Sequence, residues 1–381
     1  MIALRECGIL RSNPMYLFCM VIFPVFMTFF FTTLLDEGVP SELPCGVVDL
    51  DNTNTTRAIV RKLDAFQTTK VTHYYNNVNE ARRAIQRGEI YAVLYLPRGT
   101  TSDLIASRQP KVSFYYNGVI MMAGNMLYRD LKTITTLGSA AVGMAKLSAL
   151  GKTENEIMTF LQPIAIDLHM ISNPWLNYNV YLSTIMVPGL MMLFIFLITV
   201  YSIGTELKFN RSREWFQMAG GNTVIALTGK LIPQFLVFLS VLGGYAWYLF
   251  GHLEFPHPGG TSMILMLIVL TILASKGFGV FIFSLMPSLR MSMSVSSLWA
   301  MLGFSMSGAT FPVFAMDSML EGLSCLFPLR HYYMIYQICI FNGYPLVDAW
   351  PNFVFLLIFI LLPTLNGKRI KKAMLEYIYI P

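Results

Sequence analysis

Six long apolar stretches dominate this chain of 381 residues. A helix needs about 20 mostly apolar residues to cross the hydrocarbon core of a bilayer. Six segments meet that requirement, at residues 15–35, 180–203, 231–250, 262–285, 291–315 and 350–367. Charged residues make up only 13% of the chain, whereas soluble domains carry roughly 25%. The predicted fold class is a membrane all-α bundle of six transmembrane helices.

Basic residues near the ends of these stretches predict the orientation of the bundle. Lys and Arg concentrate in loops that face the cytoplasm, and six crossings place both termini on one side. That side holds Arg5, Arg11, Lys208, Arg211, Arg213, Lys230, Arg290, Lys368, Arg369, Lys371 and Lys372. Across the membrane, residues 251–261 contain no Lys or Arg, and residues 316–349 contain only Arg330. Both termini are therefore predicted to be cytoplasmic, and the net charge of +6 is a topology signal rather than a sign of nucleic-acid binding.

The unequal spacing of the stretches defines the domain organisation. Residues 36–179 are long enough to form a domain outside the membrane, inserted between helices 1 and 2. Strand-like segments at 45–50, 70–75, 90–96 and 111–116 alternate there with helix-like segments at 56–66, 78–87, around 103, up to 149 and at 153–161. This alternation predicts an α/β domain with a sheet covered by helices. The other parts are an interfacial cytoplasmic helix at 1–14, a cytoplasmic coupling-helix loop at 204–230, helices 3–6 within 231–367 and a cytoplasmic tail at 368–381.

The external segment shows no catalytic or metal-binding constellation. His73 and His169 are isolated, and a lone histidine is more often structural. Asp49 and Asp51 lie at the end of a strand-like segment, where a metal or acid role competes with helix capping, the favoured interpretation.

Five cysteines are scattered along the chain without C-x-x-C spacing, so neither a zinc site nor a redox motif is expected. Cys7 and Cys19 fall on or near the inner side. Cys45, Cys325 and Cys339 fall outside, where a disulfide and buried free thiols are both compatible with the sequence.

The loop after the second stretch contains a short amphipathic helix in which charged residues alternate with large apolar ones. One interpretation places this helix in the lipid headgroup layer. The other docks it on a cytoplasmic partner through charge pairs. The candidate docking residues are Thr205, Glu206, Lys208, Arg211, Arg213, Glu214 and Trp215.

Residues 311–345 are apolar but broken repeatedly by Pro and Gly. The pieces are too short to cross a bilayer and suit a re-entrant segment, which survives at membrane depth only against protein or a cavity. A helical hairpin resting on the outer membrane surface is the alternative. The candidate residues of a translocation path or gate are Ser305, Ser307, Phe311, Pro312 and Lys276.

Lys276 is the one charged residue well inside a predicted span. A charge at membrane depth suggests a functional role such as proton relay. Snorkelling of the lysine stem, or pairing with a neighbour, is favoured because the spans contain no Asp or Glu to continue a relay.

With these features the chain resembles the permease subunits of ABC type-2 exporters, in particular bacterial drug- or lipid-exporter permeases with an external domain between the first two spans. The matching residues before and in the first two spans are Asn13-Pro14, Pro24, Asn173-Pro174-Trp175 and Pro188-Gly189. Those further along are Gly204-Thr205-Glu206, Gly229-Lys230-Leu231-Ile232-Pro233, Ser307-Gly308, Phe311-Pro312 and Pro328-Leu329-Arg330-His331-Tyr332. The E-x-G-T-x-E-x-L-like run of the family is loosened here to residues 210–216.

The resemblance implies a dimer, of two identical or two related permeases, in the bacterial inner membrane. An ABC ATP-binding subunit would dock on the cytoplasmic helix, and ATP and Mg would be bound there, because the sequence has no G-x-x-x-x-G-K-[ST] loop and no cofactor is expected on this chain. Alternating access would then move a hydrophobic or amphipathic substrate outward. A periplasmic adaptor protein is a further implied partner of the external domain.

Two other classes of function are open at this point. A non-transporting scaffold or receptor of similar topology would act through its external domain. A membrane-embedded enzyme is disfavoured because the spans lack His, Asp and Glu.

Overall fold

The structure is a computed structural model that describes residues 1–106, 108–161, 173 and 176–377. The chain divides into two compact units, one formed by Met1–Asp36 with Ile171–Pro381 and the other by Glu37–Met170. His169 and the Pro174-Trp175 part of the motif before the second predicted span lie outside the described residues.

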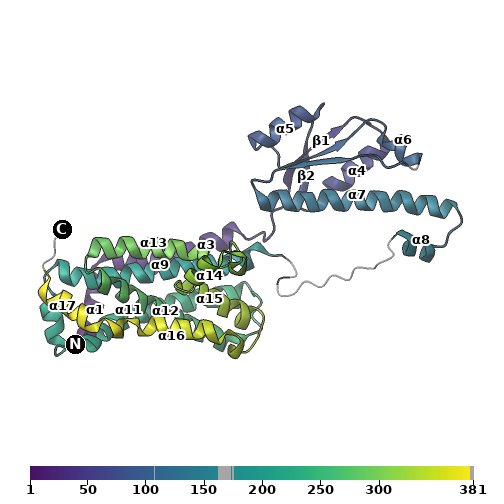
Figure 1. Cartoon of the computed structure of the whole chain (residues 1–381). Coiled ribbons are helices and arrows are strands. Elements are labelled where there is room, and N and C mark those ends of the chain that lie inside the picture. The colour runs from purple at the N-terminus through teal and green to yellow at the C-terminus, as the bar shows by residue number, and fades with distance from the viewer. Residues whose placement is uncertain (107, 162–172, 174–175, 378–381) are drawn as a thin grey trace. The chain divides into compact units, whose positions relative to one another are not determined.

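The unit Glu37–Met170 is built around a four-stranded sheet in the order β2-β1-β3-β4 (Figure 1). Its strands are β1 Leu43–Asp49, β2 Thr69–Tyr74, β3 Ala92–Leu96 and β4 Ser113–Tyr116, and its helices are α4 Asn54–Asp64, α5 Val78–Arg87, α6 Thr100–Ile105, α7 Met121–Ala149 and α8 Glu154–Leu161. Strand β1 runs parallel to β2 and β3, and β4 is antiparallel to β3. The predicted alternation of strands and helices is thus confirmed.

Helices cover both faces of this sheet. Val47 packs with residues of α4 and α7 in one buried cluster, whereas its neighbour Val48 packs with Ala81 and Ala84 of α5 in another. Successive side chains of a strand point to opposite faces, so a continuous apolar run in β1 supplies both cores. The sheet is the middle of three layers.

The other unit is a bundle of long helices. Five of them, within the described residues, are long and apolar enough to cross a membrane: Pro14–Leu34, Tyr178–Lys208, Thr223–His252, Gly260–Leu285 and Leu346–Leu365. The elements of these spans are α2 Pro14–Leu17, η1 Phe18–Ile22 and α3 Phe23–Leu34, then α9 Tyr178–Lys208, α11 Thr223–Ala246, η2 Trp247–His252, α12 Gly260–Leu285, η5 Leu346–Ala349 and α16 Trp350–Leu365. Helices α1 Ile2–Ser12 and α17 Gly367–Glu376 lie at the same end of the bundle (Figure 1).

The predicted span at 291–315 differs from the other five. The chain there forms α13 Leu289–Met306, which ends well before Ala315 and is not among the five apolar helices. The reason is composition, since serines at 292, 294, 296 and 297 and Arg290 lower the hydropathy of this segment. The helix nevertheless packs along α9 and α15, and Ser292 and Ser296 are fully buried.

The remaining elements lie at the two ends of the bundle. They are α1 Ile2–Ser12, α10 Ser212–Met218, η3 Val313–Ala315, α14 Ser318–Ser324, α15 Pro328–Ile335, η4 Tyr336–Phe341 and α17 Gly367–Glu376. Helix α15 contacts α12, α13 and α16, and its side chains Leu329, Tyr332 and Ile335 are buried. A short apolar helix packed against protein is what the re-entrant interpretation of residues 311–345 requires.

Close backbone contact joins α12 to α16. A Cβ atom at Gly277 would lie 2.2 Å from the carbonyl oxygen of Phe359, a separation that no side chain tolerates. Glycine at this position therefore lets the two helices approach closely, as small residues do between membrane helices.

Candidate functional site

The turn between α9 and α11 begins where α9 is stopped by a left-handed residue. Asn210 has a φ of 57°, and the amide of Arg211 donates to the carbonyl of Glu206 at 2.8 Å, which closes the helix end. Helix α10 follows, and Gly220 and Gly221, with φ values of 63° and 75°, reverse the chain. Because glycine adopts this region without strain, α11 begins only a few residues after α10 ends.

Helix α10 is fixed by its apolar side. Trp215 and Phe216 are 0% and 2% exposed, and the indole nitrogen of Trp215 donates to the carbonyl of Ala226 in α11 at 3.2 Å. The opposite side of α10 presents Arg213 and Glu214 to solvent. A seven-residue helix is thereby held rigidly while its charges stay free to meet another molecule.

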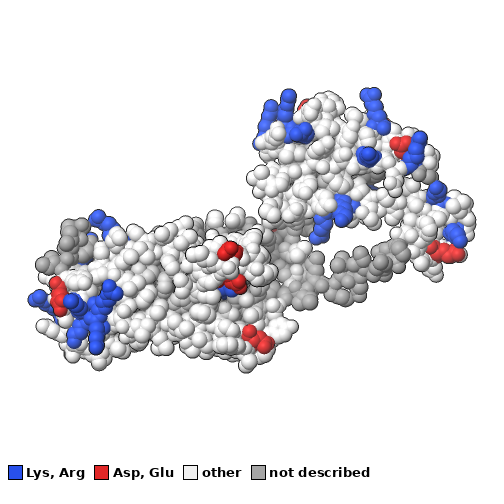
Figure 2. Space-filling model, in the orientation of Figure 1, with Lys and Arg blue, Asp and Glu red and all other residues white. Residues whose placement is uncertain are grey.

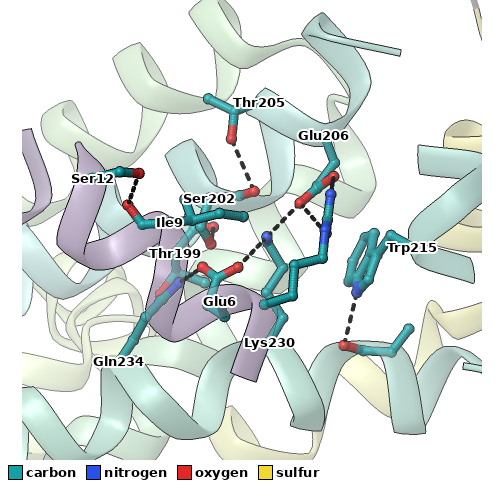
Figure 3. A network of polar contacts seen from close by, with 12 residues as sticks. Glu6, Ile9, Ser12, Thr199, Ser202, Thr205, Glu206, Trp215, Lys230 and Gln234 are labelled. Atoms are coloured by element: carbon teal, nitrogen blue, oxygen red, sulfur yellow. Dashed lines mark hydrogen bonds and ion pairs between the residues drawn. The ribbon is translucent and has the colours of Figure 1, made fainter. Parts of the chain in front are cut away.

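Behind α10, a buried network of charges joins α1, α9 and α11 (Figure 3). Glu206 accepts two hydrogen bonds from the guanidinium of Arg5, at 2.9 and 3.0 Å, and one from Lys230 Nζ at 2.8 Å. Lys230 also donates to Glu6 at 2.7 Å. The other Glu6 oxygen accepts from Gln234 at 2.9 Å, and Gln234 in turn accepts from Lys276 of α12 at 3.1 Å.

This network is almost completely removed from solvent. Glu6 and Lys230 are each 1% exposed and Glu206 is 3% exposed. Burying ions costs several kcal/mol each, which is recovered only when the charges are paired and their remaining bonds are satisfied. The arrangement meets that condition and makes the N-terminal helix α1 a structural part of the bundle. Hydrogen bonding to Glu206 raises the pKa of Arg5 above its ordinary value, so its guanidinium stays charged.

The sequence model described as "ABC-2 family transporter protein" matches residues 14–365, most of the chain. The chain belongs to the ABC-2 transporter family. It is accordingly a multi-pass membrane protein and a transport subunit that is not itself catalytic. Permeases of this family typically work with an ATP-binding subunit. A search of curated proteins finds no match to the chain.

The structure separates the predicted docking residues of this ABC-2 permease into two groups. Lys208, Arg211, Arg213 and Glu214 are exposed, and the cations of Lys208 and Arg211 lie 5.7 and 5.5 Å from the ring of Phe209. Glu206 and Trp215 are buried, which corrects their predicted position on a docking surface. Their charge and indole N–H are already satisfied within the chain, as is the Thr205 hydroxyl, which donates to Ser202 at 3.1 Å.

The predicted gate residues do not form one group either. Ser307 is buried and donates to the carbonyl of Phe304 at 2.7 Å, a bond that closes the end of α13. Ser305, Phe311 and Pro312 are exposed around the same helix end. Lys276 lies instead in the buried network, where it donates to Gln234; of the two interpretations favoured from the sequence, snorkelling and pairing with a neighbour, the structure shows pairing.

Sequence reasoning missed the partners of Glu206. The sequence marks Arg5 as a topology signal and Lys230 as a topology signal and part of a family motif, and it gives no reason to single out Glu6 or Gln234. A local signal does exist, because Lys230 and Gln234 are four residues apart and share one face of α11. Which carboxylates they meet depends on the packing of α11 against α9, 24 residues away at Glu206, and against α1, 224 residues away at Glu6. A pattern within α11 alone does not encode either contact.

In the α/β unit Thr53, rather than either aspartate at the end of β1, is the N-cap of the next helix, α4, and the aspartates bond to other backbone amides. Asp51 accepts from the amides of Gly99 and Thr101 at 2.8 and 2.9 Å, and Asp49 accepts from the amides of residues 51 and 52. Hydrogen bonds from Thr101, first through its side chain and then through its backbone, lower the pKa of Asp51. No cluster of three or more metal-binding side chains occurs among the described residues.

The five cysteines are all free thiols in the structure. Cys45 lies inside β1 with no exposure, and burial raises the pKa of its thiol to about 12. It behaves as a small apolar residue of the sheet core. His73 stacks on Tyr75 at the surface, with ring centroids 5.9 Å apart, in keeping with a structural role.

Proposed function

We propose that this permease is the membrane subunit of an ATP-driven exporter, and that a separate ATP-binding subunit docks on the exposed residues Lys208, Arg211, Arg213 and Glu214. The cargo would be hydrophobic or amphipathic and would leave the cytoplasm or the inner leaflet of the bacterial inner membrane. Two permease copies, identical or related, would enclose the path. The ATP and Mg would belong to the partner.

The observation that carries this proposal is the rigid mounting of α10. A segment that a partner protein moves must expose residues that bind the partner and must be attached firmly to the membrane helices that are to move. Helix α10 meets both needs, because Arg213 and Glu214 are exposed while Trp215 is bonded to α11. The Glu206–Lys230 ion pair then ties α9 to α11, so the two spans would move together with α10.

Charge distribution supports a cytoplasmic position for this end of the bundle. Lys and Arg gather at the end that holds α1 and α17, and acidic residues show at the opposite end (Figure 2). The positive-inside rule would then place α1, α10 and α17 in the cytoplasm. With α13 as a sixth, polar crossing, the unit Glu37–Met170 would lie in the periplasm, within reach of an adaptor protein.

The test begins with affinity purification of the tagged full chain from its own membranes, followed by measurement of ATP hydrolysis and identification of any co-purifying protein with a phosphate-binding loop. We expect such a subunit, and we expect Arg211→Glu with Arg213→Glu to abolish both its recovery and the hydrolysis. The matched control is Arg82→Glu with Arg83→Glu, exposed on α5 of the α/β unit. A wild-type chain that brings down no ATP-binding subunit would support a scaffold or receptor and refute the exporter.

A further inference from the structure

Helix α17, the last helix among the described residues, is bonded along its length to the turn that carries α10. The carbonyl of Gly367, at the start of α17, accepts from Thr223 at 3.4 Å. One turn later Lys371 donates to the carbonyl of Gly221 at 2.8 Å. A further turn on, Ser212 donates to the sulfur of Met374 at 3.4 Å. Successive turns of α17 thus follow the segment from Ser212 to Thr223.

The inward face of α17 belongs to the same core as α10. Ile370, Ala373 and Met374 recur at the spacing of one helix face and are 0%, 1% and 2% exposed. Ile370 and Met374 share a buried cluster with Trp215 and Phe216. Helices α10 and α17 are therefore two parts of one rigid platform, although more than 140 residues separate them in sequence.

The outward face of α17 is strongly basic. Lys368, Arg369, Lys371 and Lys372 are all exposed, and the only acidic residue of the helix, Glu376, lies 3.9 Å from Lys372 in an exposed pair. Such pairs contribute little, so the face keeps its positive charge. Arg211 and Arg213 are also exposed, and Ser212 between them donates to Met374 of α17.

The positive-inside rule explains why basic residues follow a membrane span, but it does not explain why these residues lie on a folded helix that is bonded to the α10 turn. Orientation depends only on the number of Lys and Arg near the membrane and needs neither a folded helix nor bonds to a distant turn. Fixing four cations on a helix reduces the freedom that they would have in a tail. A fixed array of like charges is what recognition of an acidic surface requires, because it raises the association rate and selects the partner.

We propose that α17 is a second docking element, whose Lys368, Arg369 and Lys372 bind an acidic surface of the ATP-binding subunit next to the contact made by α10. The proposal rests on the proposed function and adds to it the surface that the partner must present. Lys371 is left out of the set because its ammonium is bonded to Gly221.

The test uses the full-length permease in nanodiscs of zwitterionic lipid and the ATP-binding subunit that co-purifies with it, prepared separately. The variant Lys368→Gln, Arg369→Gln, Lys372→Gln removes three cations from α17. The control Arg82→Gln, Arg83→Gln, Arg87→Gln removes three exposed cations from α5. We expect the α17 variant to bind the subunit at least about tenfold more weakly and the control to bind within about twofold of wild type.

Two further measurements test whether positive charge causes the loss of affinity. The difference between wild type and the α17 variant should shrink as salt rises from about 0.05 to about 0.5 M, because exposed charge pairs are screened. The variant Lys368→Arg, Lys372→Arg keeps the charge and should retain wild-type affinity. An unchanged melting temperature of the α17 variant shows that the platform is intact.

The outcomes separate the two proposals. A wild-type chain that yields no ATP-binding subunit overturns the proposed function and this inference with it. A wild-type complex that the α17 variant forms equally well overturns the inference alone. If the variant loses affinity only in nanodiscs that contain anionic lipid, the basic face binds lipid headgroups and the docking role is wrong.

Discussion

Lys230 and Glu206 form an ion pair of 2.8 Å between two long helices, although the side chains are only 1% and 3% exposed. Such a pair is satisfied only because each partner has a further one, Glu6 for Lys230 and Arg5 for Glu206. Removing any member leaves a charge without compensation in a medium that solvates it poorly. The consequences can be measured.

Lys230→Met should destabilise the permease strongly. It leaves the carboxylates of Glu6 and Glu206 facing each other in the buried network, for an expected loss of about 3–5 kcal/mol. Thermal unfolding in detergent would show a large drop in melting temperature. The matched change Lys208→Met, at an exposed position, should leave the melting temperature nearly unchanged, and equal effects of the two variants would contradict the buried network.

Two nearby glutamates should separate stability from partner binding. Glu206→Gln weakens the bonds to Arg5 and Lys230 and should cost about 3 kcal/mol. Glu214→Gln removes only an exposed charge and should change stability by no more than about 0.5 kcal/mol, while lowering affinity for the ATP-binding subunit. The melting temperature should therefore fall more in Glu206→Gln, and the affinity for the ATP-binding subunit should fall in Glu214→Gln without a matching loss of stability. A Glu206→Gln protein as stable as wild type would contradict the buried network.

Gly277→Ala should disturb the contact of α12 with α16. The added methyl would lie 2.2 Å from the carbonyl oxygen of Phe359, so the helices must separate, at a cost of about 1–3 kcal/mol. Gly243→Ala is the control, because its methyl meets nothing within 4 Å and alanine favours the helix. Gly277→Ala should lower the melting temperature and Gly243→Ala should not; equal melting temperatures would contradict a role of Gly277 in the close approach of α12 and α16.

The stability of the α/β unit should fall in acid through Asp51. Its hydrogen bonds favour the carboxylate and lower its pKa, so the contribution is fully present above the unfolded value of about 3.9 and is lost as pH falls through the lower folded value. The melting transition of this unit, followed in the full chain from about pH 5 downward, should drop. Asp51→Asn should flatten that part of the pH dependence, and an identical profile would exclude this carboxylate as its source.

Local signals predicted the α/β unit well. Helix α5 has the bounds predicted from periodicity, and Asn77 and Gly88 supply the start and stop. The same signals overstated the span at 291–315, because its large apolar residues are separated by serines and the chain leaves the helix after Met306. They also placed Glu206 on a docking surface. The Glu206 carboxylate is instead buried against Arg5, which is 201 residues away in sequence. No local sequence pattern encodes a pairing of this kind.

The wide sequence separation within the buried network has a consequence for synthesis. Helix α1 leaves the ribosome before α11, and Glu6 meets Lys230 only after 224 more residues have been made. At roughly 5–20 residues per second, the helix waits on the order of ten seconds or more with its carboxylate exposed to water. The Glu6–Lys230 contact can therefore form only after α11 has taken its place in the bundle.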